Sequence, residues 1–153
     1  MIELFPMIPA SSKPLWFLGG IILFLLILTG LFSYIAYSSK TVQFEISKEG
    51  LNIRGGFYKR LIPAESIIVE KSKQIDIGKE SSYKPILRTN GIGLPGYASG
   101  WFKLRNGEKA LLFITNPSRV VYIATREGYS VLLSVQDAER FLQLIGNVSK
   151  DAD

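Results

Sequence analysis

The chain of 153 residues contains no cysteine and no histidine. Without cysteine it has no disulfide, no thiolate metal site, no cysteine nucleophile and no lipid attached through a thiol. Without histidine it lacks the usual general base and the commonest transition-metal ligand, and a Ser-His-Asp triad is excluded. No pair of carboxylates stands at a spacing typical of acid–base catalysis. We therefore predict no enzyme activity, no catalytic residue, no metal and no cofactor.

Charged residues are also missing from Leu15 to Ile35. At about 1.5 Å per helical residue this apolar run is roughly 30 Å long, which matches the hydrocarbon core of a bilayer. Trp16 and Phe17 lie at one end of the run, and Tyr34 and Tyr37 lie at the other. Aromatic residues at these places are typical of the two membrane interfaces. The run therefore predicts a transmembrane helix.

Two alternatives to a retained membrane span stay open. Lys13 precedes the run and the small residues Ala36 and Ser38 follow it, as in a cleaved signal peptide. The apolar core of a signal peptide has only about 7–15 residues, however. A core helix of a globular domain would carry a polar stripe, and this run has none. We therefore expect a single-pass protein of the cell membrane.

The positive charges that flank the run predict its orientation. Lys13 is the one basic residue before it, whereas Lys40, Lys48 and Arg54 follow it within about 20 residues. By the positive-inside rule, the C-terminal domain is expected in the cytoplasm. The predicted division of the chain is a tail at 1–14, a transmembrane helix at 15–37, a short linker at 38–40, a β domain at 41–148 and a C-terminal tail at 149–153.

After residue 40 the hydrophobic period changes from that of a helix to that of a strand. Apolar and polar residues alternate, and glycine-containing turns separate the runs. Gly55-Gly56 and Asn106-Gly107 are two-residue hairpin signals. Residues 72–99 show no sustained period and are predicted to be irregular. The predicted strands span residues 41–47, 51–53, 57–62, 66–71, 101–105, 110–115, 120–125 and 129–133.

The last predicted element is an amphipathic helix. Ser134 is expected to cap it, and Asp137 completes a capping box. Four apolar residues fall on one helical face, and Gly146-Asn147 is expected to end the helix. The apolar residues of this face are Ala138, Phe141, Leu142 and Ile145. The predicted fold class is a mainly-β barrel of 7–8 antiparallel strands, capped by this C-terminal helix and preceded by the N-terminal transmembrane helix.

This architecture resembles the pleckstrin-homology (PH) superfold, and particular segments sharpen the resemblance. Residues 88–97 (RTNGIGLPGY), 100–110 (GWFKLRNGEKA) and 116–123 (NPSRVVYI) are similar to the signature of a family of bacterial PH-domain membrane proteins. The ending Leu133-Ser134 into Phe141-Leu142 also fits this signature, so the resemblance covers roughly residues 42–146. It implies a PH-like barrel and a binding role, but no particular ligand, because a fold does not fix a function.

Two motifs within this stretch have competing interpretations. Gly91, Gly93 and Gly96 match G-x-G-x-x-G, but a strand rather than a helix is expected next, so nucleotide binding is not predicted. Residues 54–109 carry 11 basic and 5 acidic residues. This excess suggests either a solvated surface or an attraction to anionic headgroups.

Nine residues are candidates for lipid or partner binding. In eukaryotic PH domains phosphoinositides are held by a basic cluster across the first hairpin. Lys48 and Arg54 lie there in this chain, but the dense second-strand pair is missing. This departure from the pattern argues against phosphoinositide binding, and if the domain binds lipid, a generic anionic headgroup is expected instead. The candidates are Lys48, Arg54, Lys59, Arg60, Lys84, Arg88, Tyr97, Trp101 and Lys103.

The short linker is expected to hold the domain against the bilayer, so the domain needs no lipid affinity of its own to reach it. The prediction is a membrane-tethered PH-like binding or scaffold module that acts through protein partners or self-association. Anionic headgroup binding by the basic face is the alternative, and an enzyme is a distant one. Membrane lipids around the single span are expected partners, and no nucleic acid partner is expected.

Overall fold

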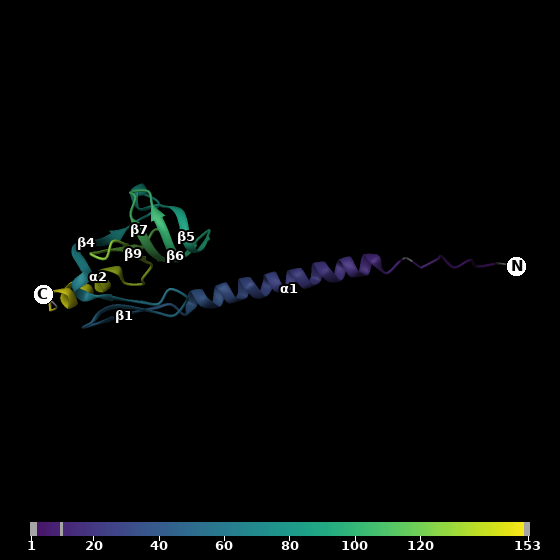
Figure 1. The fold of residues 1–153 in the computed structure, drawn as a ribbon, viewed down its shortest axis with the longest axis horizontal. Helices are drawn as coiled ribbons and strands as arrows, with labels where there is room; N and C mark the ends of the chain where they lie inside the picture. The colour runs from purple at the N-terminus through teal and green to yellow at the C-terminus, as the bar shows by residue number, and fades with distance from the viewer. Residues whose placement is uncertain (1–2, 10, 152–153) are drawn as a thin grey trace. The chain divides into compact units, whose positions relative to one another are not determined.

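The computed structural model describes residues 3–9 and 11–151. The chain divides into two compact units, Met1–Lys40 and Thr41–Asp153 (Figure 1). The first unit contains one long helix, and the second contains all of the strands among the described residues together with the C-terminal helix. The two units are described separately below.

The helix of the first unit, α1 (Lys13–Lys40), begins where Pro14 fits the first turn, because the missing N–H of a proline has no intrahelical partner there. The carbonyl of Ser12 accepts hydrogen bonds from the amides of Leu15 and Trp16. Residues Lys13–Tyr37 are long and apolar enough to cross a membrane, and a signal sequence near an N-terminus has the same properties. The helix continues through residues 38–40, which were predicted to be a linker and instead form its last turn.

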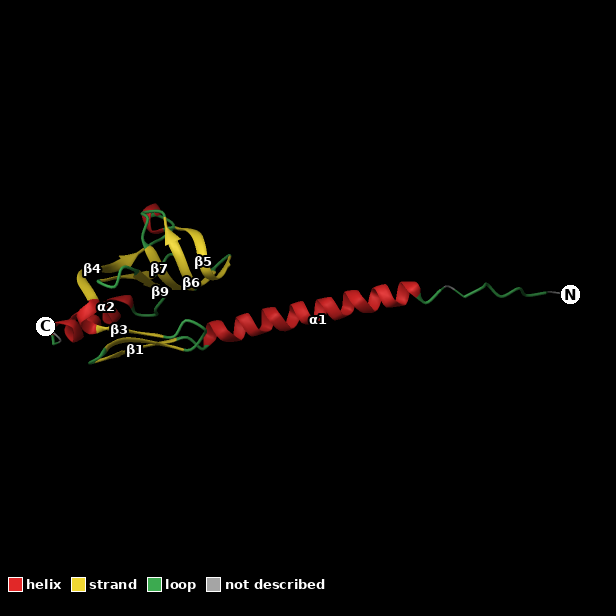
Figure 2. Cartoon of the chain, in the orientation of Figure 1, coloured by secondary structure: helices red, strands yellow, loops and turns green. Residues whose placement is uncertain are grey.

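The second unit contains two sheets (Figure 2). The smaller sheet has the order β1-β2-β3 and is antiparallel throughout. The larger sheet has the order β4-β8-β9-β7-β6-β5, and short 3-10 turns lie at Ala64–Ser66 and Ser81–Tyr83. The strands are β1 (Gln43–Ser47), β2 (Gly50–Arg54), β3 (Arg60–Pro63), β4 (Ile67–Ile75), β5 (Pro85–Leu94), β6 (Tyr97–Leu104), β7 (Lys109–Ile114), β8 (Val120–Thr125) and β9 (Ser130–Leu133).

The predicted barrel of 7–8 antiparallel strands is corrected in three respects. The described part of the chain has nine strands, in two sheets that do not close into one barrel. One pair, β7 with β9, is parallel. The chain runs from β7 past this position to β8 and then returns, so β9 pairs with β8 on one side and β7 on the other. Turn signals predicted that consecutive strands reverse direction, but not which strands are neighbours.

Residues 72–99, predicted to be irregular, contain the end of β4 and the whole of β5. Strand β5 shows no alternating pattern because most of its side chains are exposed. Its register with β6 shifts twice, at Pro85/Leu87 and at Arg88/Asn90. The β5–β6 turn contains Gly96 at φ +76°, a conformation that suits glycine. The G-x-G-x-x-G match therefore lies in a strand, a turn and a second strand, and opens no helix.

Two hydrophobic clusters make up the core, and they lie on opposite faces of the larger sheet. Leu111 and Phe113 of β7 belong to the first cluster, which also includes residues of the smaller sheet and the C-terminal helix. Leu112 and Ile114 belong to the second cluster. Strands that are buried on both faces have continuous apolar sequences. This explains why β7 and β8 lack the alternation seen in β1.

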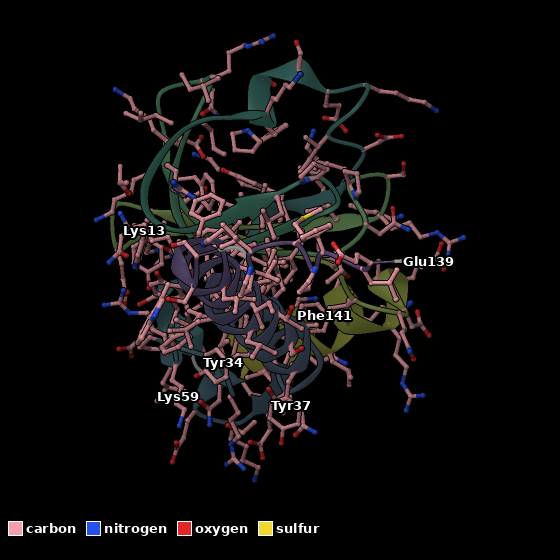
Figure 3. All side chains as sticks on the ribbon, turned by 90° about the vertical axis from the view of Figure 1, so that its right-hand side faces the viewer. Lys13, Tyr34, Tyr37, Lys59, Glu139 and Phe141 are labelled. Atoms are coloured by element: carbon pink, nitrogen blue, oxygen red, sulfur yellow. The ribbon has the colours of Figure 1, made fainter. Side chains whose placement is uncertain are left out.

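The C-terminal helix, α2 (Ala138–Lys150), contacts both sheets through its apolar face. Phe141 and Ile145 are buried, which confirms the predicted face, and Glu139 points to solvent (Figure 3). The predicted capping box is wrong, because the N-cap is Asp137, whose Oδ1 accepts from the Arg140 amide at 3.0 Å. The Ser134 hydroxyl accepts instead from the backbone amides of residues 115 and 116.

The helix also does not end at Gly146-Asn147 as predicted, but continues to Lys150. Packing extends it, because the Ser149 hydroxyl is buried and donates to the carbonyl of Ala64 at 3.3 Å. Gly146-Asn147 is a local sequence at which a helix can end, but tertiary contacts of the residues after it stabilise the longer helix.

Candidate functional site

The nine candidate residues do not converge on one site. Lys48 lies in the turn between β1 and β2, and Arg54 ends β2. The Nε of Arg54 lies 2.7 Å from Oε2 of Glu45 on the neighbouring strand. This ion pair offsets the positive charge on the first hairpin, where a headgroup site was considered.

The other candidates lie on the β3 side of the smaller sheet or on the β5–β6 hairpin. Lys59 is exposed just before β3 (Figure 3), and Arg60 is the first residue of that strand. Lys84 precedes β5 and Arg88 lies within it. Tyr97, Trp101 and Lys103 belong to β6. Two separate surfaces result: the first brings together the candidates Arg60 and Trp101, and the second consists of other residues, with the candidate Arg88 beside it.

The first surface is an aromatic–cation cluster of Arg60, Trp101, Lys109 and Tyr129. The guanidinium carbon of Arg60 lies 5.4 Å from the centroid of the Trp101 ring and 5.1 Å from that of Tyr129. The Lys109 ammonium lies 4.6 Å from the Trp101 centroid. The two rings meet edge to face at 5.1 Å. Contacts of this kind join β3 of the smaller sheet to β6, β7 and the start of β9 in the larger one.

Tyr129 has a perturbed environment within this cluster. Its hydroxyl donates to Oε2 of Glu127 at 2.7 Å. Burial raises the pKa of Tyr129 to about 12, the hydrogen bond to Glu127 adds to this, and the nearby Arg60 charge opposes it. The phenol is therefore neutral and serves as a hydrogen-bond donor across the physiological range.

Among the described residues the cations of the cluster form no ion pair, although Glu127 lies nearby as the partner of the Tyr129 hydroxyl. Lys103 and Lys109 are direct register partners across β6 and β7, an arrangement in which like charges repel. Within the described part of the chain, neither these lysines nor Arg60 lies within 4.0 Å of a carboxylate oxygen. The arrangement can fasten the two sheets together and can also accept an anion. Lys109 and Tyr129 were not among the candidates from the sequence; the strand after the Asn106-Gly107 turn was predicted to begin at residue 110, and its register with Lys103 was not predicted.

The second surface is the β5 edge patch, defined by the exposed residues Ile86, Leu87 and Leu94. Their side chains are 57%, 56% and 42% exposed. Strand β5 is the outermost strand of the larger sheet, so one row of its backbone amides and carbonyls faces no other described strand. None of these three residues was among the nine candidates. An apolar stretch becomes a candidate binding site only when it lies at a sheet edge, and the sequence alone does not show which strand is at the edge.

The β5 edge patch also has a hollow beside it of about 450 Å³. Its floor forms where Gly93 has no side chain, since an added Cβ would lie 3.5 Å from the Phe102 ring. The lining includes Ile86, Arg88, Gly93, Leu94, Ala98 and Phe102. An apolar side chain of another molecule fits the chemistry of this hollow.

The other sheet edges carry protecting features, and β5 differs from them less in lacking such features, since it begins at Pro85 and leaves register twice, than in exposing three large apolar side chains. The edge strand β1 carries the Glu45–Arg54 ion pair and turns its apolar residues to the core. Strand β3 is four residues long and ends in Pro63. Strand β4 leaves register between Ile68 and Lys73, and the Ser72 hydroxyl donates to the Ile68 carbonyl in this bulge. Charges, proline, short length and bulges are common means of protecting an edge.

A hydrogen-bonded polar group lies at a third place, next to the β4 bulge, where the exposed Glu108 meets the buried residues Tyr122 and Ser130. Oε2 of Glu108 accepts hydrogen bonds from the Tyr122 hydroxyl at 2.9 Å and the Ser130 hydroxyl at 3.0 Å. Burial and the hydrogen bond to Glu108 raise the pKa of Tyr122. Because each hydroxyl has a partner, this group is explained by structure alone. Among residues 3–9 and 11–151 no group of His, Cys, Asp and Glu is suited to hold a metal ion.

Comparison with known proteins gives one match. The family model described as "Bacterial PH domain" matches residues 42–148. No curated protein matches the chain, and no solved structure matches it. The matched region covers every strand described above and nearly all of α2.

Proposed function

Because the chain belongs to the bacterial PH domain family, we propose that it is a membrane-anchored binding module that acts through a protein partner at the β5 edge patch. PH domains are generally non-catalytic binding modules, which agrees with this role. In the proposal α1 is a retained single span, and the PH domain works in the cytoplasm at the surface of the cell membrane.

The observation that carries the proposal is the contrast between β5 and the other edges. An exposed apolar edge strand invites pairing with another chain, and proteins normally blunt such edges. In this domain β1, β3 and β4 are blunted, and β5 also begins at a proline and has two register shifts, but β5 exposes two leucines and an isoleucine. Strand addition to a free edge is an established mode of peptide recognition, in which backbone hydrogen bonds supply affinity and side-chain hollows supply specificity.

The membrane anchor supports a partner-binding role in a second way. Anchoring confines the domain to two dimensions, so a weak site meets a high effective concentration of any partner in the same membrane. Because α1 holds the protein at the membrane, the PH domain needs no lipid affinity of its own to reach it. Its binding surface is free for a partner.

Photo-crosslinking in native membranes tests the proposal. A photoreactive residue at Leu87 is compared with one at Gln143, which is exposed on α2. We expect discrete adducts heavier than the chain from position 87 and few from position 143. An adduct of twice the chain mass identifies self-association. Absence of adducts at position 87, or equal yields at both positions, contradicts the proposal.

Anionic headgroup binding at the aromatic–cation cluster is the second candidate function. The observation that favours it is the group formed by Arg60, Lys103 and Lys109, none of which forms an ion pair among the described residues. A phosphate placed between Arg60 and Lys109 relieves the repulsion between the paired lysines and makes charge-assisted hydrogen bonds. The measurement that tests it is given in the Discussion.

A further inference from the structure

The charges around the β5 edge patch indicate which kind of partner it binds. Residues 84–105, which include β5, its turn and β6, contain four basic residues and no aspartate or glutamate. The basic residues are Lys84, Arg88, Lys103 and Arg105. The patch therefore presents apolar side chains within a purely positive surround.

These four charges are also uncompensated from outside the hairpin. Across the described residues, the ion pairs are Arg54 with Glu45, Lys73 with Glu80 and Lys79 with Asp76, and none of the four belongs to them. Arg54 ends β2 and pairs with Glu45 of β1, whereas Lys73 of β4 and Lys79 pair with acids that follow β4 in the chain. The β5–β6 hairpin differs because, among the described residues, no acidic side chain pairs with its cations.

Of these charges, Arg88 lies on the edge strand β5 itself and Lys103 lies on β6, the next strand in. Leu87 is the direct partner of Lys103, which in turn opposes Lys109 on β7. Arg88 is the partner of Phe102 and lines the hollow beside the patch. One face of the sheet near β5 therefore carries Leu87 and Lys103, and the other carries Phe102 and Arg88.

We infer that the partner of the β5 edge patch is an extended acidic segment of another protein, with apolar and acidic residues alternating, which adds to the larger sheet as a seventh strand. The inference rests on the proposed function, whose site it shares. The segment's backbone pairs with the outer amides and carbonyls of β5, as in strand addition at other sheet edges. One apolar side chain enters the hollow over Gly93, and the carboxylates face Arg88 and Lys103. Opposite charge across the interface steers the approach and sets the choice of partner.

A peptide series tests the inference on the full chain in micelles of a zwitterionic detergent. The probes are fluorescein-labelled decapeptides of alternating valine and glutamate, valine and serine, or valine and lysine. A fourth probe is the valine–glutamate peptide with proline at two central positions. Binding is measured by fluorescence anisotropy at low and at high salt.

We expect the valine–glutamate peptide to bind about tenfold or more tightly than the valine–serine peptide, as two or three surface ion pairs provide. The valine–lysine and proline peptides bind least, and high salt removes the difference between the acidic and neutral probes. Arg88→Glu narrows the difference between the acidic and basic probes, because three cations remain on the hairpin, whereas Arg119→Glu, exposed beyond β7, leaves it unchanged. Equal binding of all three alternating probes, or undiminished binding of the proline probe, overturns the inference.

The outcomes separate the inference from the proposed function. Adducts at Leu87 in native membranes together with no charge preference among the peptides overturn the acidic-strand inference and leave a partner at β5. A charge preference that Arg88→Glu does not alter also overturns it. Absence of both adducts and peptide binding overturns the proposed function itself.

Discussion

Leu87 and Lys103 are direct register partners across β5 and β6, so an exposed leucine on the outermost strand lies beside an unpaired lysine on the next. This juxtaposition of apolar and positive side chains at a free backbone edge distinguishes β5 from the other edges of the domain. It is the structural basis of the proposed partner site, and it can be altered without touching the core.

Replacing Ile86 and Leu87 together by threonine is expected to abolish partner adducts formed from a photoreactive residue at Leu94. Both side chains are more than half exposed, and threonine retains strand propensity. The free energy of unfolding should therefore change by no more than about 0.5 kcal/mol per residue. The control is Leu61→Thr on β3, where the leucine is 44% exposed. Adducts that persist in the double variant, or vanish equally in the control, contradict the assignment of the patch.

Gly100→Ala is expected to destabilise the domain far more than Gly96→Ala. A Cβ at position 100 would lie 2.5 Å from the Asn90 carbonyl oxygen, and φ there is +116°. At position 96 φ is +76°, but no atom lies within 4 Å of the added Cβ. The second change costs only backbone strain, about 1 kcal/mol, and the first should cost at least twice that. Chemical denaturation of the two variants measures the difference, and equal losses would show that β5 and β6 do not approach closely at Gly91 and Gly100.

The second candidate function predicts that glycerol 3-phosphate changes the fluorescence of Trp101 in the full chain. The measurement uses a Trp16→Phe background, so that Trp101 is the sole tryptophan. Arg60→Gln with Lys109→Gln should eliminate the response, since these two cations lie over the indole ring. The control removes the same charge elsewhere, by Arg119→Gln with Lys150→Gln. A response that the control loses as well reflects net charge alone and rejects the site.

The aromatic–cation cluster also predicts a pH dependence. The pKa of Tyr129 is raised from 10.0 to about 12 in the folded protein, so folding favours its neutral form. The contribution of Tyr129 to stability is therefore complete below pH 10 and is lost as the pH rises from there to about 12. Phenolate absorbance should show a tyrosine that ionises near pH 12 and is missing from Tyr129→Phe. An unchanged high-pH titration in that variant would contradict the burial of Tyr129.

Much of the fold could be predicted because its signals are local. The Asn106-Gly107 turn joins β6 and β7 as predicted, with the Leu104 amide bonded to the Glu108 carbonyl at 2.8 Å. The antiparallel pair β8–β9 and the apolar face of α2 were also predicted correctly. Each of these features follows from residues within about ten positions of each other, where hydrophobic period and turn chemistry decide the outcome.

The errors came from features set by long-range contacts. Strand β5 escaped prediction because its edge position frees it from the alternating pattern that a half-buried strand requires. The parallel pairing of β7 and β9 depends on which strands become neighbours, and turn signals carry no such information. The helix α2 passes Gly146 because Ser149 reaches Ala64, 85 positions earlier.

The candidate site was predictable only in part for the same reason. Arg60 and Trp101 were named as candidates from their residue types, and the structure brings them together. Lys109 and Tyr129 complete the cluster from strands whose pairing was not known in advance. Ile86, Leu87 and Leu94 were not named, because an apolar residue becomes a candidate only once topology places it on an unpaired edge.

Hydrogen exchange of the β5 amides, compared between native membranes and the purified chain in zwitterionic micelles, tests the central claim most directly. A partner strand on β5 protects the outward amides of Pro85–Leu94 in the membrane and leaves them to exchange after purification. The amides of the edge strand β1 serve as the internal reference and should exchange alike in both samples. Equal exchange of β5 in the two samples would contradict a partner at this edge.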